Sequence, residues 1–437
     1  MTTPSYFLSL ALEGVRCFGP QQTLDLSDGE GRPARWTLIL GENGTGKTTL
    51  LQTLGELRLR QVKDGTKTNL DTALEGWSRS WKRLDGSPAG LRAAYFSEAL
   101  AGIGFQAQVR VKGLFEGDVR FSEFDNLRVV LFQNFFLIGY GATRRISGTD
   151  IKPSEQADPT ATLFDPDARL LNAEELLLRL DYRALQQKRQ GAAQRRLEQV
   201  TEMLRALLPD VDDITLQPDE GNGSIRSGLE NSVRFKTPYG WVPLSGLSLG
   251  YQTMIAWTVD LASRLFDRYP DSPDPLKEHA VVLVDEIDLH LHPRWQRDIM
   301  AYLSERFPAV QFIATAHSPL IVQAAGEFGA NVVVLRREGD HVVIDNEPDL
   351  VAGWRVDQIL ASDLFTGVDS ARGPQTEAKL AERRRLLQKK ARTPDEEQRL
   401  DELNGWEKRL PTATSSGDQE AMDLLRHFAD QIRAPKP

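Results

Sequence analysis

The sequence predicts an α/β fold with a mixed β-sheet, and three observations support this prediction. Short apolar runs typical of buried strands recur along the chain, as at 36–40 and 280–284, and helical patterns follow them. The first of these runs leads directly into a glycine-rich loop and then a helix. At 437 residues, 40% of them hydrophobic, the chain has enough apolar material for one large domain with insertions or for two or three domains.

The composition excludes several classes of protein. A single cysteine, Cys17, is incompatible with a disulfide scaffold or a cysteine-rich zinc module, and it suits a reducing cytosol. No apolar run approaches the ~18 residues of a membrane span, and the first ten residues lack the basic region of a signal peptide. The net charge of −9 argues against a surface that coats DNA, although it is compatible with a local basic patch. We therefore expect a cytoplasmic protein that makes no membrane contact.

The N-terminal segment predicts a strand hairpin followed by a buried strand. Residues 7–12 and 22–26 alternate polar and apolar side chains, with glycine-containing turns between them. The apolar run 36–40 is typical of a buried strand, and the leucine pattern after the glycine-rich loop predicts a helix. Residues 60–127 are rich in glycine and charge, and the alternating piece 106–111 suggests an edge strand of an insertion.

The middle of the chain combines a strand with a helical segment. The apolar stretch 129–138 predicts a second buried strand. Residues 172–208 have a helical pattern that Pro209 ends. Folded as a hairpin, this segment would span about 25–30 Å, which is far too short for a long coiled coil. Strands are expected at 214–216 and 232–236, around a turn-rich stretch.

The second half alternates helices and strands. A helix is predicted from Ser248, and the strongest buried strand covers 280–284. Shorter apolar strands are expected at 310–314 and 332–335, with a helix from Ser318 between them. This alternation is typical of a sheet with helices packed on its faces.

The tail from about residue 351 is helical and highly charged. Helical patterns cover 376–390 and 394–410, with few strand signals. The second helix has a strong start at 393–396, where a threonine hydroxyl can cap it, proline fits the first turn, and acidic residues meet the positive end of the helix dipole.

The glycine-rich loop has the sequence Gly-x4-Gly-Lys-Thr at 41–48, between a strand and a helix. In that context glycines let backbone N–H groups converge on a β-phosphate, Lys47 supplies a point charge to the β- and γ-phosphates, and Thr48 offers a hydroxyl to Mg²⁺. We therefore expect this loop to bind MgATP. The residues expected to contact the nucleotide are Gly41, Asn43, Gly44, Gly46, Lys47, Thr48 and Thr49.

Two acidic residues end the strongest buried strand. Asp285 is placed to reach the magnesium shell through water, and Glu286 can orient and polarise the attacking water. A later strand ends in His317, followed by the helix-capping Ser318. A histidine at a strand end is often structural, but this imidazole can also reach a γ-phosphate oxygen.

The order of these motifs resembles an ABC-type ATPase of the SMC/RecF class, which has a P-loop NTPase head. Residues 247–252, Leu-Ser-Leu-Gly-Tyr-Gln, then stand where that class has its signature motif. In that class the signature caps the γ-phosphate of ATP bound by the opposite protomer, so that two MgATP are held in a head-to-tail homodimer. The resemblance implies that Ser248 and Gly250 bind nucleotide in this way. From the residues alone, the motif is also compatible with an ordinary capped helix.

The same resemblance implies further site residues. Asp288 lies where the class has its D-loop, which crosses the dimer interface, and Arg16 matches the arginine between the first two strands that approaches the nucleotide. His290 and His292 could suggest a metal site, but no third ligand is evident nearby and the D-loop accounts for their position. Residues 139–144 occupy the approximate place of the Q-loop, but no glutamine ends that strand, so the Q-loop residue stays unassigned.

A narrower resemblance comes from the amino-acid sequences of residues 284–296 and 314–319, and residues 140–145 support it. These segments look like predicted bacterial ATP-binding proteins of the "involved in virulence" type and the ATPase subunits of Septu and related retron anti-phage systems. The match covers roughly residues 5–345. Such ATPases generally gate a separately encoded effector, often an HNH nuclease. No nuclease motif is recognisable in this chain, so any nuclease would be a partner.

The motifs divide the chain into four expected parts. These are 1–171, the N-terminal half of the ATPase head with an insertion at about 60–127; 172–209, a short helical insertion in place of a coiled coil; 210–350, the C-terminal half of the head; and 351–437, a helical C-terminal region.

These features favour an ATP-driven switch, a homodimer or higher homo-oligomer that hydrolyses ATP and regulates a partner nuclease in anti-phage defence. Catalysis is expected to depend on Lys47, Glu286 and His317. Two alternatives are a RecF-like DNA repair ATPase stimulated by DNA, and a nucleotide-sensing scaffold with negligible turnover. Four basic residues within 188–196 could contact DNA, but the interleaved glutamines and nearby glutamates favour a solvated helix face.

Overall fold

The structure is a computed structural model of the 437-residue chain. It divides into two units, residues 1–367 and 368–437, each described here by itself. The structure describes residues 4–57, 135–146, 158–208, 210–216, 233–348, 352–365 and 372–410, together with the backbone of five strands between 62 and 121.

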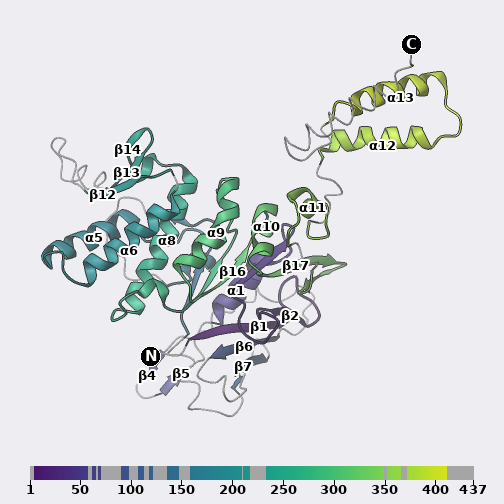
Figure 1. The fold of residues 1–437 in the computed structure, drawn as a ribbon. Helices are drawn as coiled ribbons and strands as arrows, with labels where there is room; N and C mark the ends of the chain where they lie inside the picture. The colour runs from purple at the N-terminus through teal and green to yellow at the C-terminus, as the bar shows by residue number, and fades with distance from the viewer. Residues whose placement is uncertain are drawn as a thin grey trace. The chain divides into compact units, whose positions relative to one another are not determined.

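A six-stranded sheet forms the centre of the first unit (Figure 1). Its strand order is β18-β17-β3-β16-β15-β9, with all neighbours parallel except the antiparallel pair β17–β18. The strands are β3 Trp36–Gly41, β9 Leu137–Tyr140, β15 Ala280–Val284, β16 Val310–Thr315, β17 Asn331–Glu338 and β18 His341–Asp345. The prediction of an α/β fold with a mixed sheet is therefore confirmed, and the carboxyl ends of β3, β16, β15 and β9 lie along one edge.

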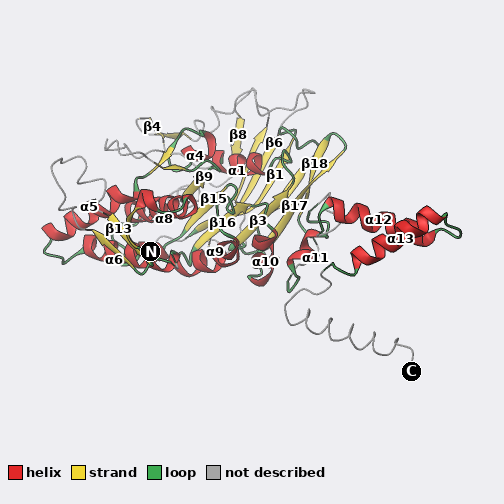
Figure 2. Ribbon diagram, turned by 90° about the horizontal axis from the view of Figure 1, so that it is seen from above, coloured by secondary structure: helices red, strands yellow, loops and turns green. Residues whose placement is uncertain are grey.

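The two faces of this sheet are covered differently (Figure 2). On β15, Val282 and Val284 belong to one core cluster, with α5 Ala173–Gln186, α6 Ala192–Leu207 and the helices α8, α9 and α10. Val281 and Leu283 belong to a second cluster, with α1 and the N-terminal strand β1 Ser5–Glu13. This division follows from the alternation of side chains along a strand. The helices are α1 Lys47–Glu56, α8 Leu249–Arg268, α9 Pro293–Arg306, α10 Pro319–Glu327 and the short α11 Val356–Leu360.

An antiparallel sheet of order β2-β1-β6-β7-β8 contains the N-terminal strand. Its strands are β1 Ser5–Glu13, β2 Gln22–Asp25, β6 Gly90–Ser97, β7 Ala107–Lys112 and β8 Asp118–Phe121, and β4 Val62–Asp64 pairs separately with β5 Lys67–Asn69. The predicted hairpin of β1 and β2 is confirmed. The prediction of an edge strand at 106–111 was wrong, because β7 pairs on both sides, with β6 and β8.

The helical segment folds as a hairpin of α5 Ala173–Gln186 and α6 Ala192–Leu207. The chain turns between them at Lys188, Arg189 and Gly191, all with positive φ. Beside the hairpin lies a three-stranded sheet of β12 Asp213–Leu216, β13 Val233–Thr237 and β14 Gly240–Pro243. Short elements complete the unit: β10 Arg145–Ile146, α4 Ala161–Phe164, β11 Arg169–Leu170, η3 Leu244–Gly246 and η4 Pro275–Lys277. Of the predicted strand 129–138, residues 129–134 lie outside the described residues.

The second unit contains the helices α12 Pro374–Gln388 and α13 Pro394–Glu407, which pack against each other through Leu386, Leu400 and Leu403. The predicted start of α13 is confirmed, since the Thr393 hydroxyl accepts from the Glu396 N–H and the Glu396 carboxylate accepts from the Thr393 N–H. No helix in the described part of either unit is both long and apolar enough to cross a membrane.

Candidate active site

The loop at 41–46 joins the carboxyl end of β3 to the first turn of α1, and its shape requires glycine. Gly41 has φ +149° and Gly46 has φ +90°, conformations that other residues rarely adopt. A Cβ at Gly41 would lie 2.7 Å from the Thr45 hydroxyl, and one at Gly46 would lie 2.4 Å from the sulfur of Cys17. Asn43 and Gly44 are exposed at the top of this loop, where their backbone can approach a ligand.

Lys47 is the first residue of α1, and its side chain folds back over the loop. Its ammonium group donates to the carbonyl oxygens of Gly41 at 2.8 Å and Glu42 at 2.9 Å, and the residue is only 7% exposed. Burial lowers the pKa of this amine, and the carboxylates of Asp285, Glu286 and Asp288 partly oppose that effect. A buried cation thus lies between the loop and the acidic residues that follow β15.

Asp285 connects α1 with two strands of the sheet. One carboxylate oxygen accepts from the Thr48 hydroxyl and the other from the Thr315 hydroxyl, each at 2.7 Å. Its backbone N–H donates to the carbonyl of Tyr140 at 2.8 Å. The predicted pair Thr48 and Asp285 therefore come together, while Thr315 is an added member at the last position of β16 that sequence reasoning did not single out.

The oxygens of Thr48 and Asp285 fit a magnesium ion. Mg²⁺ prefers oxygen ligands and is commonly held by one or two protein groups together with waters and substrate phosphates. In the described part of the chain, no group of three or more His, Cys, Asp or Glu side chains could hold a metal by itself. A magnesium ion at this site would therefore depend on nucleotide phosphates and water for most of its ligands.

Glu286 follows Asp285 in a strained backbone conformation. Its φ is +49°, which costs on the order of 1–3 kcal/mol for a residue with a side chain. Its N–H donates to the Thr315 hydroxyl at 2.7 Å, and its carbonyl accepts from Arg144 Nη2 at 2.5 Å. The half-buried carboxylate makes no hydrogen bond to any described residue. It is therefore available to a water molecule near the loop.

Arg144 is the fourth residue after β9, and its guanidinium lies near these acidic residues. It is 2% exposed, and burial lowers its pKa to about 10, although the carboxylates of Asp285, Asp288 and Glu286 partly oppose the shift. The guanidinium therefore keeps its charge at neutral pH. The sequence pattern marked this segment only as the approximate place of an unassigned Q-loop.

Asp288 and His317 are linked across the ends of β15 and β16. Asp288 Oδ2 accepts from the His317 backbone N–H at 3.0 Å. The Gln296 side chain donates to the Asp288 carbonyl at 3.4 Å and accepts from the Ser318 hydroxyl at 2.6 Å. The backbone around His317 is therefore fixed close to Asp288, while the role of its imidazole toward phosphate stays a prediction.

The two histidines beside Asp288 have other surroundings. His292 caps α9, because its ring nitrogen accepts from the Arg294 N–H at 3.3 Å. His290 is exposed, with φ +64°. Neither belongs to a three-ligand cluster of described residues.

Arg16 lies beside α1 rather than above the loop. Its guanidinium donates to the Thr49 hydroxyl at 3.2 Å and to the Gln52 side chain at 3.3 Å, and burial lowers its pKa. Thr49 is buried against it. The roles of Arg16 and Thr49 in nucleotide binding remain predictions, because these hydrogen bonds join them to each other.

Ser248 and Gly250 lie at the start of α8, and within the described residues no hydrogen bond joins them to the glycine-rich loop. Ser248 caps α8 by accepting from the Tyr251 N–H at 3.4 Å and is exposed. A Cβ at Gly250 would lie 2.4 Å from the carbonyl oxygen of His290. Within one chain, the predicted signature therefore contacts the segment after Glu286.

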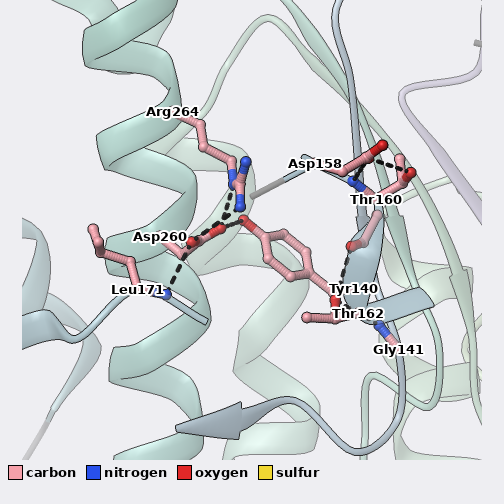
Figure 3. A network of polar contacts seen from close by, with 9 residues as sticks. Tyr140, Gly141, Asp158, Thr160, Thr162, Leu171, Asp260 and Arg264 are labelled. Atoms are coloured by element: carbon pink, nitrogen blue, oxygen red, sulfur yellow. Dashed lines mark hydrogen bonds and ion pairs between the residues drawn. The ribbon is translucent and has the colours of Figure 1, made fainter. Parts of the chain in front are cut away.

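A buried polar network joins β9 to the middle of α8 (Figure 3). Asp260, which is 2% exposed, accepts from the Tyr140 hydroxyl at 2.9 Å and from Arg264 Nε at 2.6 Å. Its other oxygen accepts from the Leu171 N–H at 3.2 Å, just before α5. Asp260 thus ties together β9, α8 and the helical hairpin, a connection that no local sequence pattern indicated.

Comparison with known proteins gives a family match and several relatives. Residues 37–323 match the family described as "AAA domain, putative AbiEii toxin, Type IV TA system". The Septu protein PtuA of Bacillus mycoides (strain KBAB4) is 26% identical over 347 residues, 78% of this chain and 42% of that protein. The "Retron Vc95 probable ATPase" of Vibrio cholerae serotype O1 biovar El Tor is 36% identical over 125 residues, 28% of this chain and 22% of that protein.

Each of these matches spans less than half the length of the relative. The SMC head domain from Thermotoga maritima is similar with a TM-score of 0.41 and 15% identity, over 78% of this chain and 98% of that one. The names of the relatives confirm the resemblance to Septu and retron ATPases predicted from the motifs.

Proposed function

Because the chain belongs to the family described as "AAA domain, putative AbiEii toxin, Type IV TA system", we propose that it binds and hydrolyses MgATP as a switch in a bacterial anti-phage system of the Septu or retron kind. The observation that carries this proposal is the hydrogen-bonded set at the carboxyl edge of the sheet. There the Thr48 hydroxyl and the Asp285 carboxylate are 2.7 Å apart, beside the buried ammonium of Lys47.

The residues at this edge have complementary chemical roles. The N–H groups of the loop and the Lys47 ammonium would hold the β- and γ-phosphates, which requires Lys47 to exchange at least one loop carbonyl for phosphate oxygen. Thr48 and Asp285 would hold the metal. Bound magnesium neutralises charge on the phosphates as the transition state forms.

Glu286 would orient the attacking water. The water oxygen forms a bond to the γ-phosphorus while the bond from that phosphorus to the β–γ bridging oxygen breaks, and ADP leaves with the electron pair. The water proton passes to the Glu286 carboxylate and then to solvent or phosphate. A carboxylate without a hydrogen bond to any described residue suits this role.

The start of α8 would complete the site of a second copy. Ser248 is exposed, and a serine hydroxyl and helix N–H groups donate to phosphate. Two chains arranged head to tail would then close on two MgATP. Hydrolysis removes the γ-phosphate that joins the halves, so the dimer opens, and a separately encoded nuclease would respond to that change.

Substitution of the proposed water-orienting residue tests this function. Glu286→Gln should bind ATP, lose hydrolysis by at least about 100-fold, and accumulate as a closed dimer in ATP. Light scattering after size-exclusion chromatography, with and without ATP, measures the assembly, and phosphate release measures turnover. Glu305→Gln, which alters an exposed glutamate in α9, is the matched control.

Three other results would redirect the proposal. An ATP-independent assembly of Glu286→Gln would contradict the dimer that closes on nucleotide. Turnover stimulated by DNA, and lost steeply as salt rises, would favour a RecF-like repair ATPase. Tight ATP binding with no turnover by the wild type would favour a nucleotide-sensing scaffold.

A further inference from the structure

We infer that Arg144, together with Thr315, is a positioning residue that holds the peptide of Glu286 in the conformation needed for hydrolysis. The inference rests on the proposed function, because it assumes that Glu286 orients the attacking water. It assigns a role to a segment that the motif pattern left without one.

Sheet order brings the three residues together. Strand β15 lies between β16 and β9. Thr315 is the last residue of β16, Glu286 is the second residue after β15, and Arg144 is the fourth residue after β9. Glu286 is therefore flanked by Thr315, at the end of one neighbouring strand, and by Arg144, just after the other.

Side chains bind both the backbone N–H and the backbone carbonyl of Glu286. Thr315 accepts from its N–H at 2.7 Å, and Arg144 donates to its carbonyl at 2.5 Å. Thr315 also donates to Asp285 at 2.7 Å, so the same hydroxyl fixes the adjacent acidic residue. These bonds fix the backbone at φ +49° while the Glu286 carboxylate keeps no hydrogen bond to any described residue. The hydrogen bonds therefore hold the backbone of Glu286 in place and leave its carboxylate able to bind water.

Burial of Arg144 is otherwise hard to explain by packing alone. A guanidinium has five N–H donors, and a buried one is normally satisfied by several acceptors. Within the described residues, Arg144 makes one hydrogen bond, to the Glu286 carbonyl, and its Nε is buried with no partner. Asp288 Oδ1 is likewise buried, with no hydrogen-bond partner among the residues that the structure describes. The charge of Arg144 therefore interacts with the carboxylates of Asp285, Glu286 and Asp288 together, whereas its hydrogen bond is made to the backbone carbonyl of Glu286.

The test compares turnover with nucleotide affinity. Arg144→Gln should lower kcat about 30-fold, equivalent to ~2 kcal/mol at 1.36 kcal/mol per tenfold change, while the Kd for ATP stays within about threefold. Arg144→Lys keeps a cation at the buried position that can donate to the Glu286 carbonyl, so it should fold even if Arg144→Gln does not, and it should retain an intermediate kcat. Arg35→Gln is the matched control. It removes an arginine that donates to backbone carbonyls of α9 and its C-terminus, beside the amino end of β3.

A double-mutant cycle separates positioning from general structural support. If Arg144 acts through Glu286, Arg144→Gln should change the single-turnover rate less than about twofold in the Glu286→Gln background. An equal 30-fold loss in that background, or a kcat in both Arg144 variants within threefold of wild type, would overturn the inference. A wild type without turnover would overturn the proposed hydrolysis and this inference together, whereas an active wild type with an equally active Arg144→Gln would overturn the inference alone.

Discussion

The carboxyl edge of the central sheet and the start of α8 both carry residues predicted to contact nucleotide, yet they are built differently. At the sheet edge, Lys47, Asp285 and Thr315 are buried and hydrogen-bonded to one another or to the loop. At the start of α8, Ser248 is exposed and Leu249 is 55% exposed. The difference indicates that one chain brings together the residues proposed to bind the metal and to hydrolyse ATP, whereas the start of α8 has the exposure expected of a surface that contacts another molecule.

The largest expected effect comes from removing the cation of the sheet edge. Lys47→Ala should weaken ATP binding about 100-fold, because it removes charged hydrogen bonds to phosphate worth about 1.5–3 kcal/mol each. Cys17 offers a direct measurement, since it is the sole cysteine and its sulfur lies against Gly46. ATP should slow alkylation of Cys17 by a maleimide, and the variant should need about 100 times more ATP for the same protection.

Lys277→Ala serves as the control for that experiment, since Lys277 is exposed and lies in η4. Equal ATP concentrations for half-protection in wild type and Lys47→Ala would contradict the assignment of Lys47. No slowing of alkylation in any variant would place bound nucleotide away from the loop.

A smaller and more selective effect is expected at the start of α8. Ser248→Ala in the Glu286→Gln background should weaken the ATP-dependent dimer by about tenfold, through loss of one hydrogen bond to a charged phosphate. ATP binding by the monomer should stay within about twofold. Analytical ultracentrifugation in ATP measures the first quantity, and the Cys17 alkylation assay measures the second.

Ser248 also caps α8, so the comparison needs a variant that removes a cap elsewhere. Asn172→Ala does so at α5, where the Asn172 side chain accepts from Glu174 and Glu175. If both variants weaken the dimer equally, loss of a helix cap explains the result. The proposed contact of Ser248 with nucleotide on another copy would then be contradicted.

The last expected effect is on stability rather than on nucleotide or dimer binding, and it concerns the network that joins β9 to the middle of α8. Tyr140→Phe removes the hydroxyl that donates to buried Asp260, and should lower the free energy of unfolding by about 1–3 kcal/mol. Tyr239→Phe, at a 97% exposed position, should leave it nearly unchanged. Urea denaturation measures both, and equal stability of the two variants would show that the Asp260 network contributes little.

Local patterns predicted the parts of the site that depend on neighbours in sequence. The strand, glycine-rich loop and helix at 36–56, the strand before Asp285 and the cap at Ser248 all follow from hydrophobic period, turn residues and capping chemistry. These signals operate over a few residues, so a single sequence contains them in full.

The remaining features depend on which strands become neighbours. Arg144 and Thr315 flank Glu286 only because β15 lies between β9 and β16 in the sheet. The error at β7 has the same origin, because its pairing with β6 and β8 is a property of the sheet rather than of its own alternating residues. A charged residue soon after a buried strand and a hydroxyl at a strand end were the available signals, but neither specifies its partner.

The missing side chain of Gly250 has a mechanical consequence. The carbonyl of His290 approaches so closely that even a methyl group would collide with it at 2.4 Å. The backbone of His290 and the backbone of Gly250 therefore lie close together, with no side chain of Gly250 between them to absorb a shift. In the proposed dimer, a displacement of His290 would therefore move the first turn of α8 and Ser248 with it, so that loss of the γ-phosphate in one chain would weaken its contact with the second chain.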